Sequence, residues 1–220
     1  MIVKPINFQA GPGKICNEVL KKASTDLINY NFTGQSICEI THFDDKWKQI
    51  YQDTLDNTKT FLNIPDTHNF FYISGGATHQ FSSICYNLCS KTSIVQVLIT
   101  GYWSKRAASE IKKFCKVVEI YKQEDLLDTN EYTFTYYCDN DTTIGYEIKN
   151  GLQFSPKTHF IVCDTSSILG SKIFDYSKYG VVFSSLSKNL GISGASLIIA
   201  NKQLFEKIPI YPNTPIVMDW

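Results

Sequence analysis

Short apolar runs alternate with helix-like stretches along this chain of 220 residues, and no other feature constrains the fold as strongly. Apolar or β-branched runs of strand length predict strands at residues 69–73, 94–99, 116–121, 132–137, 159–163, 180–184 and 195–200. Helical spacing of apolar residues predicts helices at 16–29, 45–62 (capped by Asp44 or Asp45), 78–89 and 103–114. Such alternation is typical of βαβ units, so we expect an α/β fold: a mainly parallel sheet flanked by helices.

Composition limits the partners and the compartment. The chain carries 21 basic and 21 acidic residues and no basic cluster, which excludes the electrostatic footprint of a nucleic-acid partner. Its seven cysteines form no C-x-x-C pair, which favours reduced thiols, most of them in the core, over a disulfide framework or a metal site. No long apolar leader opens the sequence, and no run approaches about 18 apolar residues. We therefore expect a cytoplasmic protein without membrane contact.

Residues with side chains or backbone suited to ligand binding follow five of the predicted strands. They are the Gly75-Gly76-Ala77-Thr78 turn, Trp103, Thr142, Asp164 and Lys188. Open α/β sheets bind ligands at the carboxyl ends of their strands, so we expect these groups to lie together. The glycine turn opens a predicted helix, whose free N–H groups can hold a phosphate. The indole of Trp103 can stack on a flat heteroaromatic ring.

Pyridoxal phosphate chemistry requires this set of groups: a lysine amine, an anion cradle, a ring platform and a carboxylate against the pyridine nitrogen. Each residue taken singly has an ordinary explanation. A lone lysine in a polar turn is usually a solvated surface residue, Asp164 alone fits a turn cap, and Trp103 alone fits a core position. Their joint placement at successive strand ends favours the cofactor site.

Longer motifs extend this pattern over the whole chain. They are Ile6-Asn-Phe-Gln-Ala-Gly-Pro12, Glu18-Val-Leu20, Gly34-Gln-Ser-Ile-Cys-Glu-Ile-Thr-His42, Leu62-Asn-Ile-Pro65, Gly75-Gly-Ala-Thr-His-Gln-Phe81, Gly101-Tyr-Trp-Ser-Lys105, Asp164-Thr-Ser-Ser-Ile-Leu169 and Lys188-Asn-Leu-Gly191. Together these segments resemble the phosphoserine aminotransferases, which are fold-type-I pyridoxal phosphate enzymes of aminotransferase class V. The resemblance implies the large domain of such an enzyme.

The resemblance also implies a role for each site residue. Lys188 bonds to the cofactor and moves the proton between substrate Cα and cofactor C4′, and Asp164 pairs with the pyridine nitrogen. The other implied roles are Trp103 stacking on the ring, Thr142 bonding near the ring hydroxyl, Ala77, Thr78 and Ser187 holding the phosphate, and His42 binding substrate. Two positions depart from the family pattern: Phe43 replaces an arginine that clamps substrate, and Ser187 replaces a glutamine.

The implied reaction transfers an amino group between L-glutamate and 3-phosphohydroxypyruvate, giving 2-oxoglutarate and O-phosphoserine for serine biosynthesis, in a homodimer. The expected organisation is an N-terminal segment (1–15), a cofactor-binding large domain (16–207) and the start of a connection (208–220) to a C-terminal small domain that we expect to be missing from this chain. One alternative is a catalytically silent relative that keeps the fold, with or without the cofactor, as a binding or structural protein. Another is a pyridoxal phosphate desulfurase or lyase, for which no cysteine here is convincingly placed.

Overall fold

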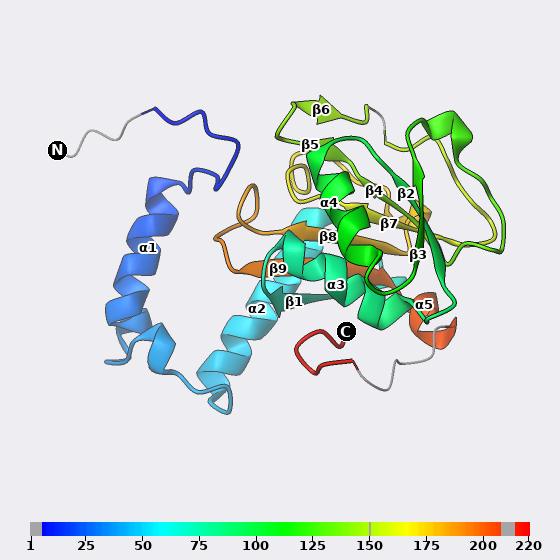
Figure 1. Ribbon diagram of the computed structural model, residues 1–220. Coiled ribbons are helices and arrows are strands. Elements are labelled where there is room, and N and C mark those ends of the chain that lie inside the picture. Colours follow the sequence, from blue (N-terminus) through cyan, green and yellow to red (C-terminus); the bar gives the residue numbers. More distant parts are fainter. Residues whose placement is uncertain (1–5, 150, 208–213) are drawn as a thin grey trace. The chain divides into compact units, whose positions relative to one another are not determined.

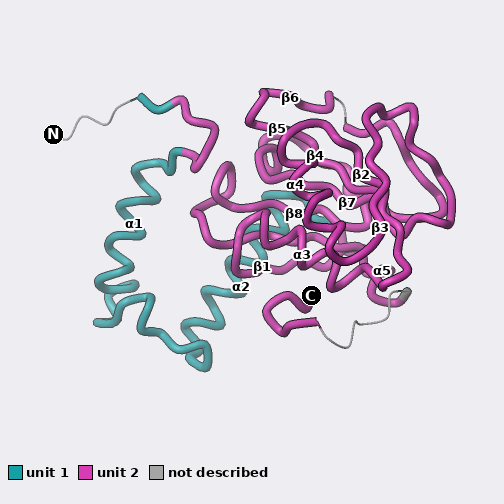
Figure 2. Tube along the Cα trace, viewed as in Figure 1, with its two compact units in different colours: residues 1–7, 14–64 teal, residues 8–13, 65–220 magenta. Residues whose placement is uncertain are grey.

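The computed structural model describes residues 6–149, 151–207 and 214–220 (Figure 1). The chain separates into two compact units (Figure 2). One comprises residues 1–7 and 14–64, and the other comprises residues 8–13 and 65–220.

The first unit is built mainly from two helices, α1 (Asn17–Ile28) and α2 (Asp45–Leu62), with 3-10 turns at Tyr30–Phe32 and Ile37–Glu39. Helix α2 begins after Asp44, whose carboxylate accepts a hydrogen bond of 2.8 Å from the amide of Lys46. This confirms one of the two predicted caps. The helix ends at Asn63, whose left-handed backbone (φ 52°) is a usual way to stop a helix.

The second unit contains a seven-stranded sheet. Its strands are β1 (His68–Ser74), β2 (Ile94–Leu98), β3 (Lys116–Ile120), β4 (Phe134–Cys138), β7 (Phe160–Asp164), β8 (Val181–Ser185) and β9 (Ala195–Asn201). The order is β1-β9-β8-β7-β4-β2-β3, and only the pairings of β9 with β1 and β8 are antiparallel. All the predicted strands and the mainly parallel sheet are therefore confirmed.

Helices α3 (Ala77–Leu88) and α4 (Tyr102–Ile111) lie across one face of this sheet (Figure 1). Phe81 and Ile84 of α3 and Ile111 of α4 belong to one buried core with strand residues such as Tyr136 and Phe183. Burying these apolar side chains supplies the main driving force that holds helices and sheet together. Helix α4 ends three residues before the predicted end, because the chain tightens into a turn at Ile111, whose carbonyl accepts the amide of Phe114 at 2.9 Å.

Two small elements were not predicted. The strands β5 (Asn140–Asp141) and β6 (Tyr146–Glu147) form a short antiparallel hairpin after β4, and helix α5 (Lys202–Lys207) follows β9. The hairpin strands have two residues each, too few to show a period in the sequence. Remaining 3-10 turns lie at Gln123–Asp125 and Tyr176–Lys178.

The core positions predicted for most of the cysteines are found for four of the seven: Cys85, Cys89, Cys138 and Cys163 are buried. Within the described ranges, no helix combines the length and apolarity needed to cross a bilayer.

The last described residues fold back onto α3. The carbonyl of Met218 accepts hydrogen bonds from Ser83 Oγ (3.1 Å) and Asn87 Nδ2 (2.6 Å), and the indole of Trp220 donates to Ser83 Oγ at 2.9 Å. Residues 214–220 thus pack on the second unit. The first part of the expected connection, residues 208–213, lies outside the described residues.

Candidate cofactor-binding site

A cavity of about 290 Å³ lies at the carboxyl ends of the sheet strands. Its lining residues are Gly76, Ala77, Thr78, Trp103, Cys138, Asn140, Asp164, Ser166, Ser167, Ser185, Ser187 and Lys188. The volume is close to the lower end of the range for small-molecule sites, roughly 300 Å³. The structure therefore brings together every cofactor-binding candidate that the sequence named, since the remaining one, Thr142, contacts Lys188 directly. We call this space the lysine cavity.

Lys188 lies in the turn after β8 and reaches the side chains of two other elements. Its Nζ donates a hydrogen bond of 2.6 Å to Thr142 Oγ1 and lies 5.9 Å from the ring centroid of Trp103. It forms no ion pair within the described part of the chain. A lysine amine held by one hydroxyl and one aromatic ring remains available to a ligand.

The N-terminal segment 8–13 fixes the main chain of the Lys188 turn. The amide of Gly13 donates to the carbonyl of Ser187 at 2.7 Å. A Cβ atom at Gly13 would lie only 2.0 Å from the carbonyl oxygen of Lys188, so the close approach requires glycine. The sequence pattern gave no reason to expect this contact.

Asp164 is the last residue of β7 and is almost completely buried, with 3% of its surface exposed. Its Oδ1 accepts the amide of Ser166 at 2.9 Å, so the carboxylate also caps a turn, as the ordinary interpretation allowed. Burial raises the pKa of Asp164, and the hydrogen bonds from Ser166 and the charge of Lys188 oppose this effect. A buried carboxylate of this kind would be stabilised by a cationic group placed against it.

The N-terminus of α3 forms an anion cradle on the same cavity. The helix starts after Gly76 without any side-chain cap, which leaves its first N–H groups for a ligand. The hydroxyls of Ser185 and Ser187 lie 3.1 Å apart, and a Cβ at Gly76 would lie 3.7 Å from Ser185 Oγ. Gly75 has a φ of +99°, which favours glycine at this turn.

Trp103 is held by a carboxylate from a different element. The amide of Trp103, in the first turn of α4, donates to Asp141 Oδ2 at 2.9 Å. The other oxygen, Oδ1, accepts the amide (2.9 Å) and hydroxyl (2.5 Å) of Thr143. Burial favours a higher pKa, but the hydrogen bonds from Thr143 and from the Trp103 amide outweigh it and lower the pKa of Asp141.

These donors and acceptors fit pyridoxal phosphate. The cavity offers an uncapped helix N-terminus and two serine hydroxyls for a phosphate, and a buried carboxylate for a protonated ring nitrogen. It also offers an indole for the ring face and a lysine amine for the aldehyde. The phosphate, the ring nitrogen, the ring face and the aldehyde of the cofactor each have a complementary group.

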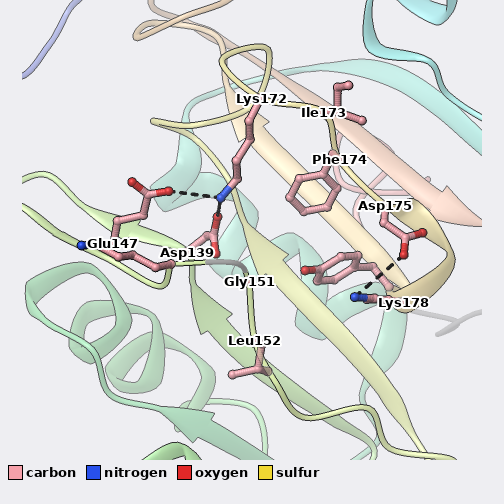
Figure 3. A pocket seen from close by; sticks show the side chains of 11 residues that line it. Asp139, Glu147, Gly151, Leu152, Lys172, Ile173, Phe174, Asp175 and Lys178 are labelled. Carbon is pink, nitrogen blue, oxygen red and sulfur yellow. Dashed lines mark hydrogen bonds and ion pairs between the residues drawn. The ribbon is translucent and has the colours of Figure 1, made fainter.

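A larger cavity of about 480 Å³ lies nearby in the same unit, and we call it the ion-pair cavity (Figure 3). Its wall includes Lys172, whose Nζ lies 3.1 Å from Asp139 Oδ2 and 3.2 Å from Glu147 Oε1. Asp175 and Lys178 form a looser pair of 3.9 Å. Asp139 follows Cys138 and precedes Asn140, both of which line the lysine cavity, so alternate residues of one segment face the two cavities.

Sequence reasoning missed several lining residues: Cys138, Asn140, Ser166, Ser167 and Ser185. Ser166 and Ser167 lie two and three residues after Asp164, and Ser185 lies two residues before Ser187, so proximity to named residues was an available signal. His42 lies in the first unit, where its ring centroid is 3.9 Å from that of Phe43. Its role in substrate binding remains a prediction.

The fold is that of an α/β protein, and its lysine cavity offers groups that fit an anionic ligand with an aromatic ring. Comparison with known proteins gives the family: the model of aminotransferase class V matches residues 6–218. The chain belongs to the class-V aminotransferase family.

Three similar proteins are phosphoserine aminotransferases. The chain is 36% identical to a probable phosphoserine aminotransferase of Dictyostelium discoideum, over 97% of this chain and 60% of the relative. It is 35% identical to phosphoserine aminotransferase of Drosophila melanogaster, over 92% and 58% respectively. Pyridoxal phosphate-bound phosphoserine aminotransferase from Trichomonas vaginalis superposes with a TM-score of 0.87 at 30% identity, over 97% of this chain and 66% of that one. The chain thus spans about 60% of the length of these curated relatives.

Proposed function

We propose that this chain forms the cofactor-binding part of a phosphoserine aminotransferase. In this proposal it binds pyridoxal 5′-phosphate in the lysine cavity and transfers an amino group between L-glutamate and 3-phosphohydroxypyruvate, a step of serine biosynthesis. The observation that carries the proposal is the convergence of Lys188, buried Asp164 and the uncapped N-terminus of α3 on one cavity. The residues that line this cavity fall within 76–188, inside the expected large domain of residues 16–207, and the similarity to named phosphoserine aminotransferases supports the substrates.

The cofactor, when bound, supplies an aldehyde for the amino group and a ring that accepts electrons. The side chains of the lysine cavity have separate roles in the reaction. Lys188 Nζ carries a proton between substrate Cα and cofactor C4′, and the Thr142 hydroxyl orients that amine from 2.6 Å. Asp164 stabilises positive charge on the ring nitrogen. The pairing is favourable because a nearby cation offsets the desolvation cost of the buried Asp164 carboxylate.

Trp103 and the anion cradle fix the position of the cofactor. The indole covers one ring face and excludes water from it. The N–H groups of Ala77 and Thr78 and the hydroxyls of Ser185 and Ser187 hold the phosphate. Ser187 provides a shorter donor than the glutamine that the family resemblance implies at this position.

The test is a titration of the purified chain with pyridoxal phosphate, followed by L-glutamate. We expect a visible absorption band that is absent in Lys188→Ala, loss of that band on adding glutamate, and one equivalent of 2-oxoglutarate. No Lys188-dependent band at millimolar cofactor would contradict the proposed function. Lys178→Ala, a change outside the lysine cavity, is the matched control and should behave as wild type.

A second candidate is a silent relative that keeps the fold and binds the cofactor without transferring an amino group. Phe43 favours it, because phenylalanine cannot form the bidentate contacts that an arginine makes with a carboxylate or phosphate. The same titration separates the two. A Lys188-dependent band that does not respond to glutamate or to O-phosphoserine would support the silent relative.

We further propose that the chain assembles as a homodimer in the cytoplasm. Helix α1 buries no residue, and Val19, Leu27 and Ile28 on it are more than half exposed, as expected of a surface that a second copy covers. Light scattering coupled to size-exclusion chromatography should give twice the chain mass. A monodisperse monomer at micromolar concentration would contradict the dimer, and cell fractionation tests the location.

A further inference from the structure

We propose that Asp141 is a positioning residue that holds Thr142 and Trp103 in a fixed relation around Lys188. The inference rests on the proposed function where it is tested by cofactor binding. The contacts from which it is argued lie within the protein and do not involve the cofactor. Asp141 does not line the lysine cavity, so its role differs from that of the residues that contact the ligand.

The two oxygens of the Asp141 carboxylate serve two different elements. Oδ2 accepts the amide of Trp103, at the N-terminus of α4, and Oδ1 accepts the amide and the hydroxyl of Thr143, in the β5–β6 hairpin. The side chain is completely buried. Buried, charge-assisted hydrogen bonds are stronger than neutral ones, so this carboxylate joins helix and hairpin firmly.

Helix α4 lacks a side chain of its own for this task. The residue at its N-cap is Gly101, and a Cβ there would lie 2.3 Å from Asp141 Oδ2. Glycine therefore leaves the space that the carboxylate occupies. A negative charge at a helix N-terminus also interacts favourably with the helix dipole.

Thr142 and Trp103 are the two side chains that the structure places around the Lys188 amine. Thr142 is adjacent to Asp141 in the hairpin, and its Oγ1 lies 2.6 Å from Lys188 Nζ. Trp103 is in the helix that Asp141 caps, and its ring centroid lies 5.9 Å from the same nitrogen. One carboxylate therefore sets both distances, and its loss should loosen both groups together.

The experiment compares wild type with Asp141→Asn in the full chain, with three readouts. The first is the Kd for pyridoxal phosphate, the second is the visible circular dichroism per unit absorbance at saturating cofactor, and the third is amide hydrogen exchange at Trp103 without cofactor. The amide group of asparagine retains one acceptor, so it cannot serve both elements. We expect a Kd higher by about 10-fold, dichroism per absorbance lower by at least about twofold, and Trp103 exchange faster by about 10-fold.

Asp175→Asn is the matched control, because Asp175 makes the same local contacts away from the lysine cavity. Its Oδ1 accepts the amide (3.2 Å) and the hydroxyl (2.6 Å) of Ser177. This variant should leave all three readouts unchanged. Thr143→Val removes only the hydroxyl that donates to Asp141 Oδ1 and should give a change in the same direction, smaller than that of Asp141→Asn.

Equal readouts for Asp141→Asn and Asp175→Asn would overturn the positioning role. If Asp141→Asn does not fold, Thr143→Val decides, and wild-type dichroism and exchange in that variant would overturn the role as well. Failure of the proposed function can be told apart from failure of the Asp141 role, because wild type would then give no cofactor absorption band. The exchange at Trp103 would still report whether Asp141 holds the helix.

Discussion

The lysine cavity and the ion-pair cavity share one segment of chain, yet their polar groups are arranged in opposite ways. In the ion-pair cavity two lysines are paired with carboxylates: Lys172 bridges Asp139 and Glu147, and Lys178 faces Asp175. In the lysine cavity, Lys188 contacts a hydroxyl instead of a carboxylate, and the N-terminus of α3 has no side-chain cap.

This difference shows that size is a poor guide to the functional site here. The ion-pair cavity is the larger of the two, at about 480 Å³ against about 290 Å³. Its buried carboxylate, Asp139, already has a cation, whereas the buried carboxylate of the lysine cavity, Asp164, accepts a hydrogen bond from a backbone amide and has no ion pair among the described residues. Groups that remain available to a ligand distinguish the site where chemistry is expected.

The largest expected difference concerns the two buried carboxylates. Asp164→Asn should slow the glutamate-driven loss of the visible band by about 100-fold, the size of effect seen when one electrostatic partner of a reaction centre is removed. The asparagine keeps the oxygen that accepts the Ser166 amide, so the fold should persist. Asp139→Asn should change that rate by less than about twofold. Stopped-flow spectroscopy measures both, and equal slowing would remove the distinction between the cavities.

The free energy of unfolding should change most when an ion pair of the ion-pair cavity is broken. Lys172→Met leaves Asp139 buried without a cation and should lower the free energy of unfolding by about 2 kcal/mol, less than for a fully buried pair because Lys172 is one-third exposed. Urea denaturation measures the loss.

The loss of stability in Lys172→Met should depend on pH. Burial raises the pKa of Asp139 and Lys172 opposes this, so removing the lysine raises the pKa further. The folded variant then takes up a proton at a higher pH than the unfolded chain does. Its deficit in stability should be greatest near pH 8 and shrink as the pH falls toward 5. A deficit that grows on acidification would show that the carboxylate is not the cause.

A smaller effect is expected from the glycine that supports the Lys188 turn. Gly13→Ala places a Cβ against the Lys188 carbonyl and should raise the Kd for pyridoxal phosphate by about 10-fold, equivalent to about 1.4 kcal/mol. Gly191→Ala is the control, since its Cβ would make only an ordinary contact of 3.7 Å with Leu186. Spectrophotometric titration should show wild-type affinity for that control. Weaker cofactor binding by Gly191→Ala, together with wild-type binding by Gly13→Ala, would contradict the role of Gly13 in supporting the Lys188 turn.

The smallest effect should come from the outer pair of the ion-pair cavity. Lys178 and Asp175 are both more than half exposed and 3.9 Å apart. Solvent and salt screen such a pair, so Lys178→Met should change the free energy of unfolding by less than about 0.5 kcal/mol. Urea denaturation of this variant beside Lys172→Met tests whether the inner bridge is the energetically important one.

The sequence predicted the sheet well because its strands are apolar runs bounded by polar turns. The carboxyl ends of parallel strands meet at one edge, which is why Trp103, Asp164 and Lys188 could be expected to converge. What could not be predicted depends on tertiary contacts. The link from Asp141 to α4 joins residues from separate elements, and the β5–β6 hairpin that carries Asp141 is too short to leave a pattern.

The ion-pair cavity illustrates the same limit. Lys172, Asp139 and Glu147 are ordinary surface residue types at unrelated positions, and only the folded chain brings them together. His42 marks a different limit. It was named from a family motif, and it lies in the compact unit that does not contain the lysine cavity, so its assignment rests on the resemblance alone.

The most direct test of the central claim is to locate the lysine that bonds to the cofactor. The chain is incubated with pyridoxal phosphate, reduced with sodium borohydride, digested and mapped by mass spectrometry. The account predicts one phosphopyridoxyl group per chain, on Lys188, with none on Lys172. Modification of Lys172, or a label spread over exposed lysines with Lys188 unmodified, would contradict it.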